Sequence, residues 1–239
     1  MKDLSILIPS RSEPYLQQTI EDIKAHAETD PEILWEEDIE PIGQRALCNR
    51  LASKAIGQYL LKIDAHCSFT QGFDRIMLED IEDDLLAIDL RELDVDTWKM
   101  NPKPLASQIV FNSNFDLISA PERPELVPET MAILGVGFMV SKENYFKYNL
   151  IDASFGSWGL MGLEVPLKMW LAGKKVKVTK KAQMGHWYKQ GEKVPYPRSI
   201  EETQITFNKV KDWAREQDYM PVVERFDWPA DWLGKKKMV

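Results

Sequence analysis

Short apolar runs alternate with amphipathic segments over the first 66 residues. Residues 4–9, 32–35 and 59–63 are short and rich in Leu and Ile, which predicts buried strands. The two stretches between them, 12–23 and 43–56, place their apolar residues on one helical face. This order predicts a mostly parallel sheet with right-handed crossovers, in which ligands bind beyond the carboxyl ends of the strands. Three loops fall at that edge: residues 10–13, 36–42 and 64–68.

The start of the first helix also has a local signal. Ser12 offers an N-cap, with Pro14 in the first turn that follows it.

The pattern is less regular in the middle of the chain. Residues 73–81 predict a helix and 85–93 a strand, whereas the proline-containing and polar stretch 94–130 predicts a long loop region. Strand character returns over 131–140, where two glycines are typical of a close approach by a ligand or another backbone. The sequence therefore predicts a mixed, mostly parallel sheet rather than a purely parallel one.

The C-terminal third begins with a predicted helix over 162–172 and a half-exposed strand around Val176. Ser199, with Glu202 three residues later, forms a capping box that opens a further helix to about residue 217. We expect one α/β domain over residues 1–198 and a C-terminal helical extension over 199–239 that packs on it.

Composition narrows the class of protein. A chain of 239 residues with 44% apolar residues suits one sizeable α/β core, and a net charge of -8 argues against a protein that coats nucleic acid. Cys48 and Cys67 lack metal-type spacing and are expected to be reduced thiols of an intracellular protein. No secretory segment opens the chain, and no run approaches the roughly 18 apolar residues of a membrane span.

A carboxylate and an imidazole stand together at the end of a predicted strand, in Asp64-Ala65-His66. Residues two apart on an extended chain point to the same side, so both groups converge on one point. Oxygen and nitrogen ligands together suit a borderline divalent ion such as Mn²⁺. A chance pair at a strand terminus is the alternative interpretation.

A third ligand would come from far along the chain. His186 follows the strand around Val176 and would complete a set of three groups, although packing against Trp187 explains it equally simply. The remaining histidine, His26, lies near a helix end and is expected to be solvated.

Five segments together resemble the catalytic domain of GT-A glycosyltransferases. The closest resemblance is to polypeptide N-acetylgalactosaminyltransferases, and a more distant one is to family 2 enzymes. It covers roughly residues 4–190 in the same order. The segments are LSILIPSRSE, GQRALCNRLASKAIGQYLLKIDAHCSF, MAILGVGFMVSKENYF, SWGLMGLEVPLKMWLAGKKVKV and MGHWYK.

The resemblance implies a role for each candidate residue. Asp64, His66 and His186 would bind Mn²⁺, which bridges the diphosphate of the donor and neutralises the leaving group. Trp158 and Gly159 would shape the pocket for sugar and acceptor, although a core role is the simpler interpretation of the tryptophan. Arg45 would lie near the diphosphate or Asp64, with a solvated helix arginine as the alternative. The nucleoside would be held by Pro9, Ser10, Arg11, Glu13 and Asp38.

Departures from the family pattern affect the catalytic base. Where the family has Trp-Gly-Gly-Glu-Asn-Leu-Glu, this chain has Trp-Gly-Leu-Met-Gly-Leu-Glu, so Met161 replaces the first Glu and Gly162 occupies the base position of family 2. Glu164 remains and could act as general base in an inverting reaction or position a substrate. Alternatively, it only complements the helix dipole. Ser12 also stands where the family commonly has Asn.

These features predict a metal-dependent glycosyltransferase that takes a sugar from a nucleotide-diphosphate donor, favoured to be a UDP-sugar. A Met at the sugar edge suggests UDP-glucose or a similar simple hexose donor. The acceptor stays open between a glycan, a protein, a lipid head group and a modified DNA base. We expect a cytoplasmic enzyme of a microbe or virus, acting inside the host cell, because the lectin domain, stem and membrane anchor of the nearest relatives are missing.

Two other functions stay open. A sugar nucleotidyltransferase would show a Gly-rich phosphate loop after the first strand, which residues 9–12 do not form. A non-catalytic nucleotide-sugar-binding module would explain Met161 and Gly162 but not the predicted metal ligands.

Overall fold

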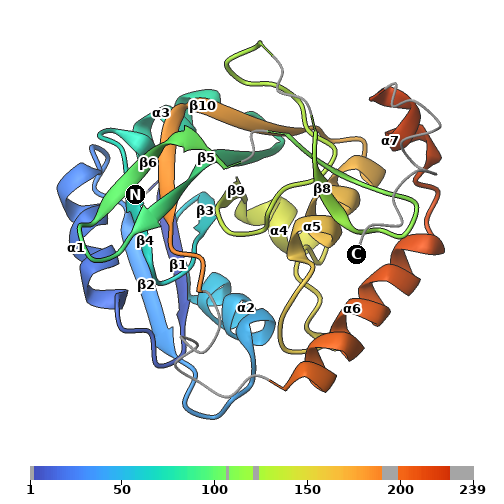
Figure 1. Cartoon of the computed structure of the whole chain (residues 1–239), viewed down its shortest axis with the longest axis horizontal. Coiled ribbons are helices and arrows are strands. Elements are labelled where there is room, and N and C mark those ends of the chain that lie inside the picture. Colours follow the sequence, from blue (N-terminus) through green and yellow to red (C-terminus); the bar gives the residue numbers. More distant parts are fainter. Residues whose placement is uncertain (1–2, 106–107, 121–123, 190–198, 227–239) are drawn as a thin grey trace.

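One mixed sheet of eight strands organises the chain (Figure 1). The computed structural model describes residues 3–105, 108–120, 124–189 and 199–226. Seven strands follow the order β2-β1-β3-β9-β5-β10-β4, and β6 pairs with β5. They are β1 (Leu4–Ser10), β2 (Glu32–Glu37), β3 (Tyr59–Lys62), β4 (Cys67–Phe69), β5 (Leu85–Asp94), β6 (Lys99–Pro104), β9 (Phe138–Ser141) and β10 (Val176–His186).

The N-terminal part has the predicted β-α-β-α-β order. β1 pairs in parallel with β2 and with β3, and the crossovers are α1 (Leu16–His26) and α2 (Gln44–Lys54). Every residue of β1 is buried, and its side chains alternate between two cores. Ile6 and Ile8 pack in the core with α1 and α3 (Phe73–Asp80), and Leu7 packs in the other core with α2.

The region predicted as a long loop contains strands, so that prediction is wrong. Within 94–130, β6 forms a hairpin with β5, and β7 (Ile109–Phe111) pairs with β8 (Leu117–Ser119). Proline is compatible with a strand here, because β6 is an edge strand and an edge tolerates residues without a backbone N–H.

The strand predicted over 131–140 begins only at Phe138. The preceding residues run against the start of α5 (Met161–Leu171), where the N–H of Ile133 donates to the carbonyl of Gly162. Gly135 has φ +76°, and a Cβ there would lie 2.8 Å from the backbone nitrogen of Gly162. The glycine-rich segment therefore serves a close backbone approach, not a longer strand.

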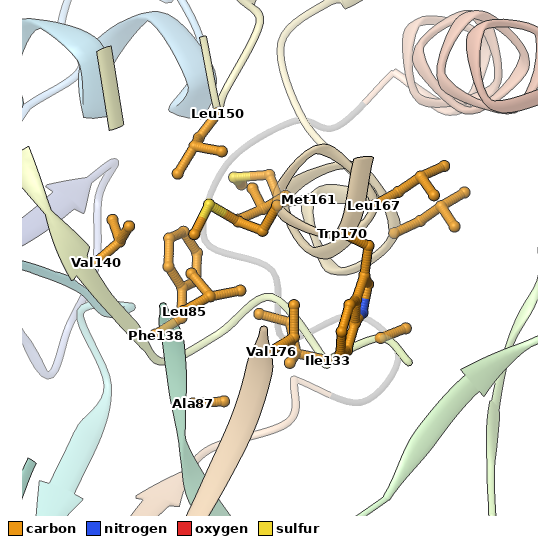
Figure 2. Close-up of a cluster of buried hydrophobic side chains, with 14 of the residues drawn as sticks. Leu85, Ala87, Ile133, Phe138, Val140, Leu150, Met161, Leu167, Trp170 and Val176 are labelled. Atoms are coloured by element: carbon orange, nitrogen blue, oxygen red, sulfur yellow. The ribbon is translucent and has the colours of Figure 1, made fainter. Parts of the chain in front are cut away.

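The largest core lies between the sheet and α5. Short helices α4 (Lys142–Lys147) and a 3₁₀ turn (Ala153–Phe155) precede α5. Figure 2 shows Met161, Leu167 and Trp170 of α5 near Leu85, Phe138 and Val176 of the sheet. The predicted helix over 162–172 is thus confirmed within one residue at each end.

Two helices lie in the last described range, residues 199–226: α6 (Ile200–Arg215) and α7 (Met220–Arg225). Ser199 caps α6 as predicted, because its Oγ accepts the N–H of Glu202 at 3.1 Å. Val210 of α6 and Val222 of α7 join the same core as α5. A domain boundary at residue 198 stays a prediction, and residues 227–239 of the predicted extension lie outside the described part. In the described ranges, no helix combines the length and apolar character that crossing a membrane requires.

Candidate functional site

A cavity of about 390 Å³ opens at the carboxyl ends of β1, β2 and β3. This volume falls in the range of small-molecule sites. The cavity also reaches the end of β10 and the first turns of α2 and α6. It is lined by many of the residues predicted from the sequence: Pro9, Ser10, Arg11, Glu13, Asp38, Asp64, His66, Trp158 and His186.

Three predicted metal ligands converge at one end of this cavity. Ligand atoms of Asp64, His66 and His186 all lie within 4.8 Å of one another. The two Nε2 atoms are 3.1 Å apart, and Nε2 of His186 is 3.2 Å from Oδ2 of Asp64. Ligands that sit about 2.1 Å from a divalent ion at right angles are separated by roughly 3.0 Å. Both contacts of His186 Nε2 therefore match the spacing of adjacent corners of one coordination shell.

Strand pairing explains how distant residues meet here. β10 runs antiparallel to β4, and His186 lies directly opposite Cys67, the neighbour of His66. The backbone N–H of Trp187 also donates to the carbonyl of His66 at 3.2 Å. The pairing brings the two imidazoles to one place although 120 residues separate them.

Glu13 orients the first imidazole. Its Oε2 lies 3.1 Å from Nδ1 of His66, and its other oxygen pairs with Lys189. Burial opposes ionisation of Glu13, but the hydrogen bonds and charges of His66 and Lys189 outweigh it and lower its pKa. A carboxylate that accepts from Nδ1–H leaves Nε2 with its lone pair toward a metal. Glu13 was predicted to hold the nucleoside, and the structure turns it toward His66.

Asp64 is held from the side away from the histidines. Its Oδ1 accepts from Nζ of Lys62 at 2.6 Å and from Nε2 of Gln44 at 3.0 Å, and Oδ2 faces His186. Burial alone would raise the pKa of Asp64, but the charge of Lys62 and the contact with His186 bring it well below its ordinary value. Burial lowers the pKa of His186, and this effect outweighs the Asp64 carboxylate, which would raise it. The lowered pKa favours the neutral imidazole that a metal requires.

Several residues of the site escaped the sequence analysis. Lys62 had a usable signal, because it interrupts an apolar strand two residues before Asp64 and so shares its side. Gln44 gave no such signal, since one polar residue at a helix start is ordinary. Further residues that line the cavity include Gly43, Ser157, Tyr188, Ser199, Glu202 and Thr203.

The acidic loop after β2 folds upon itself. The Asp38 carboxylate accepts the backbone N–H groups of Ile42 and Gly43 at 2.8 and 3.0 Å. Asp38 therefore lines the cavity while its oxygens hold the loop that leads into α2. Ser12 is not an N-cap, which corrects that prediction: α1 begins at Leu16, and the N–H of Ser12 donates to a neighbouring carboxylate, that of Glu37.

Arg45 and Glu164 form a second buried cluster outside the cavity. Their side chains are 0% exposed and paired with each other. The other Glu164 oxygen accepts from Lys168 Nζ at 2.6 Å and from the N–H of Asp152 at 2.8 Å. Neither residue lines the cavity, so this geometry does not support a general base at Glu164 or an Arg45 near the donor. The cause is the direction of Glu164, which points from α5 toward α2.

The loop around Trp158 is hydrogen-bonded to this second cluster. Arg45 donates to the carbonyl of Gly159, which has φ +110° and does not line the cavity. Trp158 does line it and stacks on Phe207 of α6, with 6.1 Å between ring centroids. Met161 lies in the core at 5% exposure and away from the cavity lining, so the argument from this residue for a simple hexose donor loses its basis.

Known proteins place these features in context. No protein-family model matches the chain. Human polypeptide N-acetylgalactosaminyltransferase 13 is 25% identical over 206 residues, which cover 80% of this chain and 37% of that protein. A putative polypeptide N-acetylgalactosaminyltransferase 13 of Drosophila melanogaster is 25% identical over 158 residues, covering 62% and 28% of the two chains. The chain thus spans about a third of the length of these curated relatives.

Solved structures decide the fold. The crystal structure of GalNAc-T7 with UDP, GalNAc and Mn²⁺ superposes with a TM-score of 0.76, at 17% identity, over 98% of this chain and 53% of that one. The chain has the GT-A glycosyltransferase fold. Residues 1–349 of S. aureus TarS with UDP-GlcNAc share this GT-A fold with a TM-score of 0.57, at 14% identity, over 83% and 62% of the two chains. The predicted fold class is confirmed.

Proposed function

We propose that this protein is a metal-dependent glycosyltransferase that takes a sugar from a nucleotide-diphosphate donor, with a UDP-sugar favoured. The observation that carries the proposal is the convergence of Asp64, His66 and His186 at one end of a cavity large enough for a ligand. GalNAc-T7 and TarS, which share the fold, have been crystallised with UDP or UDP-GlcNAc.

The ligand set fits Mn²⁺ by its chemistry. Two imidazole nitrogens and one carboxylate oxygen suit a borderline divalent ion and leave further coordination positions for phosphate oxygens. When bound, such an ion stabilises negative charge on a leaving diphosphate. Asp64 Oδ2 and the Nε2 atoms of His66 and His186 would hold it, and Glu13 would keep the His66 ring in the tautomer that this requires.

The rest of the cavity would bind the donor. The start of α2 borders the cavity at Gly43 and Gln44, so the positive end of its dipole is available to a diphosphate. Pro9, Ser10 and Arg11 form the wall where we place the nucleoside. Trp158, held against Phe207, would contact the sugar or the acceptor.

The proposal is tested by UDP release from a panel of nucleotide sugars. Water acts as a poor acceptor, so a working site should slowly release UDP in the presence of Mn²⁺, and chelation should stop it. Asp64→Ala supplies the blank. Asp83→Ala removes a carboxylate that precedes β5 and is the matched control. At least one donor should also raise the melting temperature with Mn²⁺, because it binds only the native state.

A non-catalytic nucleotide-sugar-binding module is the outcome to distinguish. If a donor protects the protein against unfolding but no donor yields more UDP than the Asp64→Ala blank, with or without an acceptor library, the transferase proposal fails and the binding module stands.

A further inference from the structure

A lysine shares the carboxylate that faces the two imidazoles. Lys62 lies in β3 at 2% exposure, and its Nζ is 2.6 Å from Asp64 Oδ1 and 3.1 Å from the carbonyl oxygen of Gly135. Lysine is almost never buried to this degree without a specific partner. Here the partner is a residue that the proposed function uses as a metal ligand.

Each of the two carboxylates in this cluster, Asp64 and Glu13, forms an ion pair with a lysine. Lys62 pairs with Asp64, and Lys189 pairs with Glu13, which contacts His66. With neutral imidazoles, these four charged side chains sum to zero. A divalent ion that enters this cluster would therefore keep most of its charge uncompensated by these nearest groups.

We propose that Lys62 is an internal cation that competes with the metal ion for Asp64 and so makes metal binding depend on the diphosphate. This inference rests on the proposed function, because it assigns the metal to Asp64, His66 and His186. Lys62 is a positioning residue, buried away from the cavity lining, and acts through the carboxylate. Mn²⁺ alone should bind weakly, and a nucleoside diphosphate should strengthen its binding by adding the missing negative charge.

The same contact holds the Asp64 carboxylate in one orientation. A partly buried carboxylate that lacks a cation is costly, and Lys62 removes that cost. Gln44 holds the same oxygen, so Oδ2 is the atom left to face His186. Side chains around Asp64 therefore direct Oδ2 toward His186.

Calorimetric titration with Mn²⁺, alone and with saturating UDP, tests this role. Lys62→Met removes the charge, and Lys62→Gln removes it while keeping a hydrogen-bond donor. We expect both variants to bind Mn²⁺ alone about tenfold more tightly or better, because a nearby positive charge is gone. The strengthening of Mn²⁺ binding by UDP should shrink, and the shift in melting temperature caused by Mn²⁺ alone should grow.

Two further variants separate charge competition from a general effect. Lys174→Met removes a lysine paired with Asp83, next to the start of β5 and far along the strands from the site, and should change neither affinity. Glu13→Gln removes the carboxylate that orients His66 and should weaken Mn²⁺ binding about 10- to 100-fold, the opposite direction.

The outcomes are distinct. If Mn²⁺ alone binds the two Lys62 variants no more tightly than it binds the wild type, Lys62 is only structural and this inference is wrong, while the proposed function stands. If Lys62→Met does not fold, Lys62→Gln decides. If the wild type binds no Mn²⁺ with or without UDP, the metal site itself fails, and both proposals fall with it.

Discussion

Two neighbouring residues at the start of α2 reach two different clusters of buried charge. Gln44 donates to Asp64 beside the cavity, whereas Arg45 pairs with Glu164, and neither of these two lines the cavity. In the cluster of Glu164, both carboxylate oxygens are taken by donors. In the cluster of Asp64, three potential ligand atoms face one another. Burial and charge are common to both clusters, and a surplus of acceptor atoms distinguishes the one that borders the cavity.

The difference also separates stability from binding. The Arg45 cluster joins α2 to α5 and to the Trp158 loop, so its loss should affect the whole domain. The Asp64 cluster opens into the cavity, so its loss should be felt mainly by a ligand.

The largest effect is expected from Arg45→Met. It leaves Glu164 as a buried charge that retains only Lys168 and one backbone N–H, and breaking a buried pair this way costs about 3–5 kcal/mol. Urea denaturation would measure the loss in the free energy of unfolding. Mn²⁺ affinity of the folded fraction should stay near that of the wild type. A variant as stable as the wild type would contradict a structural role for this cluster.

His66→Ala should have the converse effect. Loss of a residue that hydrogen-bonds a metal ligand lowers metal affinity about 10- to 100-fold. Loss of the ligand His66 itself should therefore weaken Mn²⁺-supported UDP binding on the order of 100-fold or more. Calorimetry measures this binding, and a circular dichroism melt should show an intact fold. Unchanged Mn²⁺-supported affinity would remove His66 from the site.

The smallest effect is a dependence of stability on pH that comes from His186 in the Asp64 cluster. Burial lowers the pKa of His186 below its ordinary 6.5, so at mildly acidic pH the unfolded chain binds a proton that the native protein does not. Its contribution to stability is therefore complete above about pH 6.5 and is lost as the pH falls through the lowered native pKa. The slope cannot exceed about 1.4 kcal/mol per pH unit for one group.

Denaturation in chelator between pH 7 and pH 5 measures this slope. His186→Gln should flatten it, whereas His26→Gln, a change in α1 away from the cluster, should leave it in place. Equal slopes in the wild type and His186→Gln would show that His186 is not the group responsible.

Local sequence patterns predicted some elements of the fold and not others, for physical reasons. The β-α-β-α-β start and the capping of α6 follow from local periodicity and one side-chain hydrogen bond, so they were predictable. The hairpin of β5 and β6 depends on an edge position that no local pattern encodes.

For the site, residue types identified Asp64, His66 and His186, because the three groups share one chemistry. The same approach did not show that Glu164, Arg45 and Met161 are buried and do not line the cavity. Their burial is set by how α5 packs on α2 and on the sheet, which spacing along the chain does not reveal.

One irregularity in β10 sets where His186 lies. Val176 to Thr179 pair with Leu85 to Ile88, and pairing with β5 resumes only at Gln183, so three residues of β10 have no partner on β5. Deleting one would draw His186 back by about 3.3 Å and turn its ring to the other face of the sheet. Among homologues, this stretch should accept changes of composition, at the exposed Lys181 for example, yet admit neither insertions nor deletions.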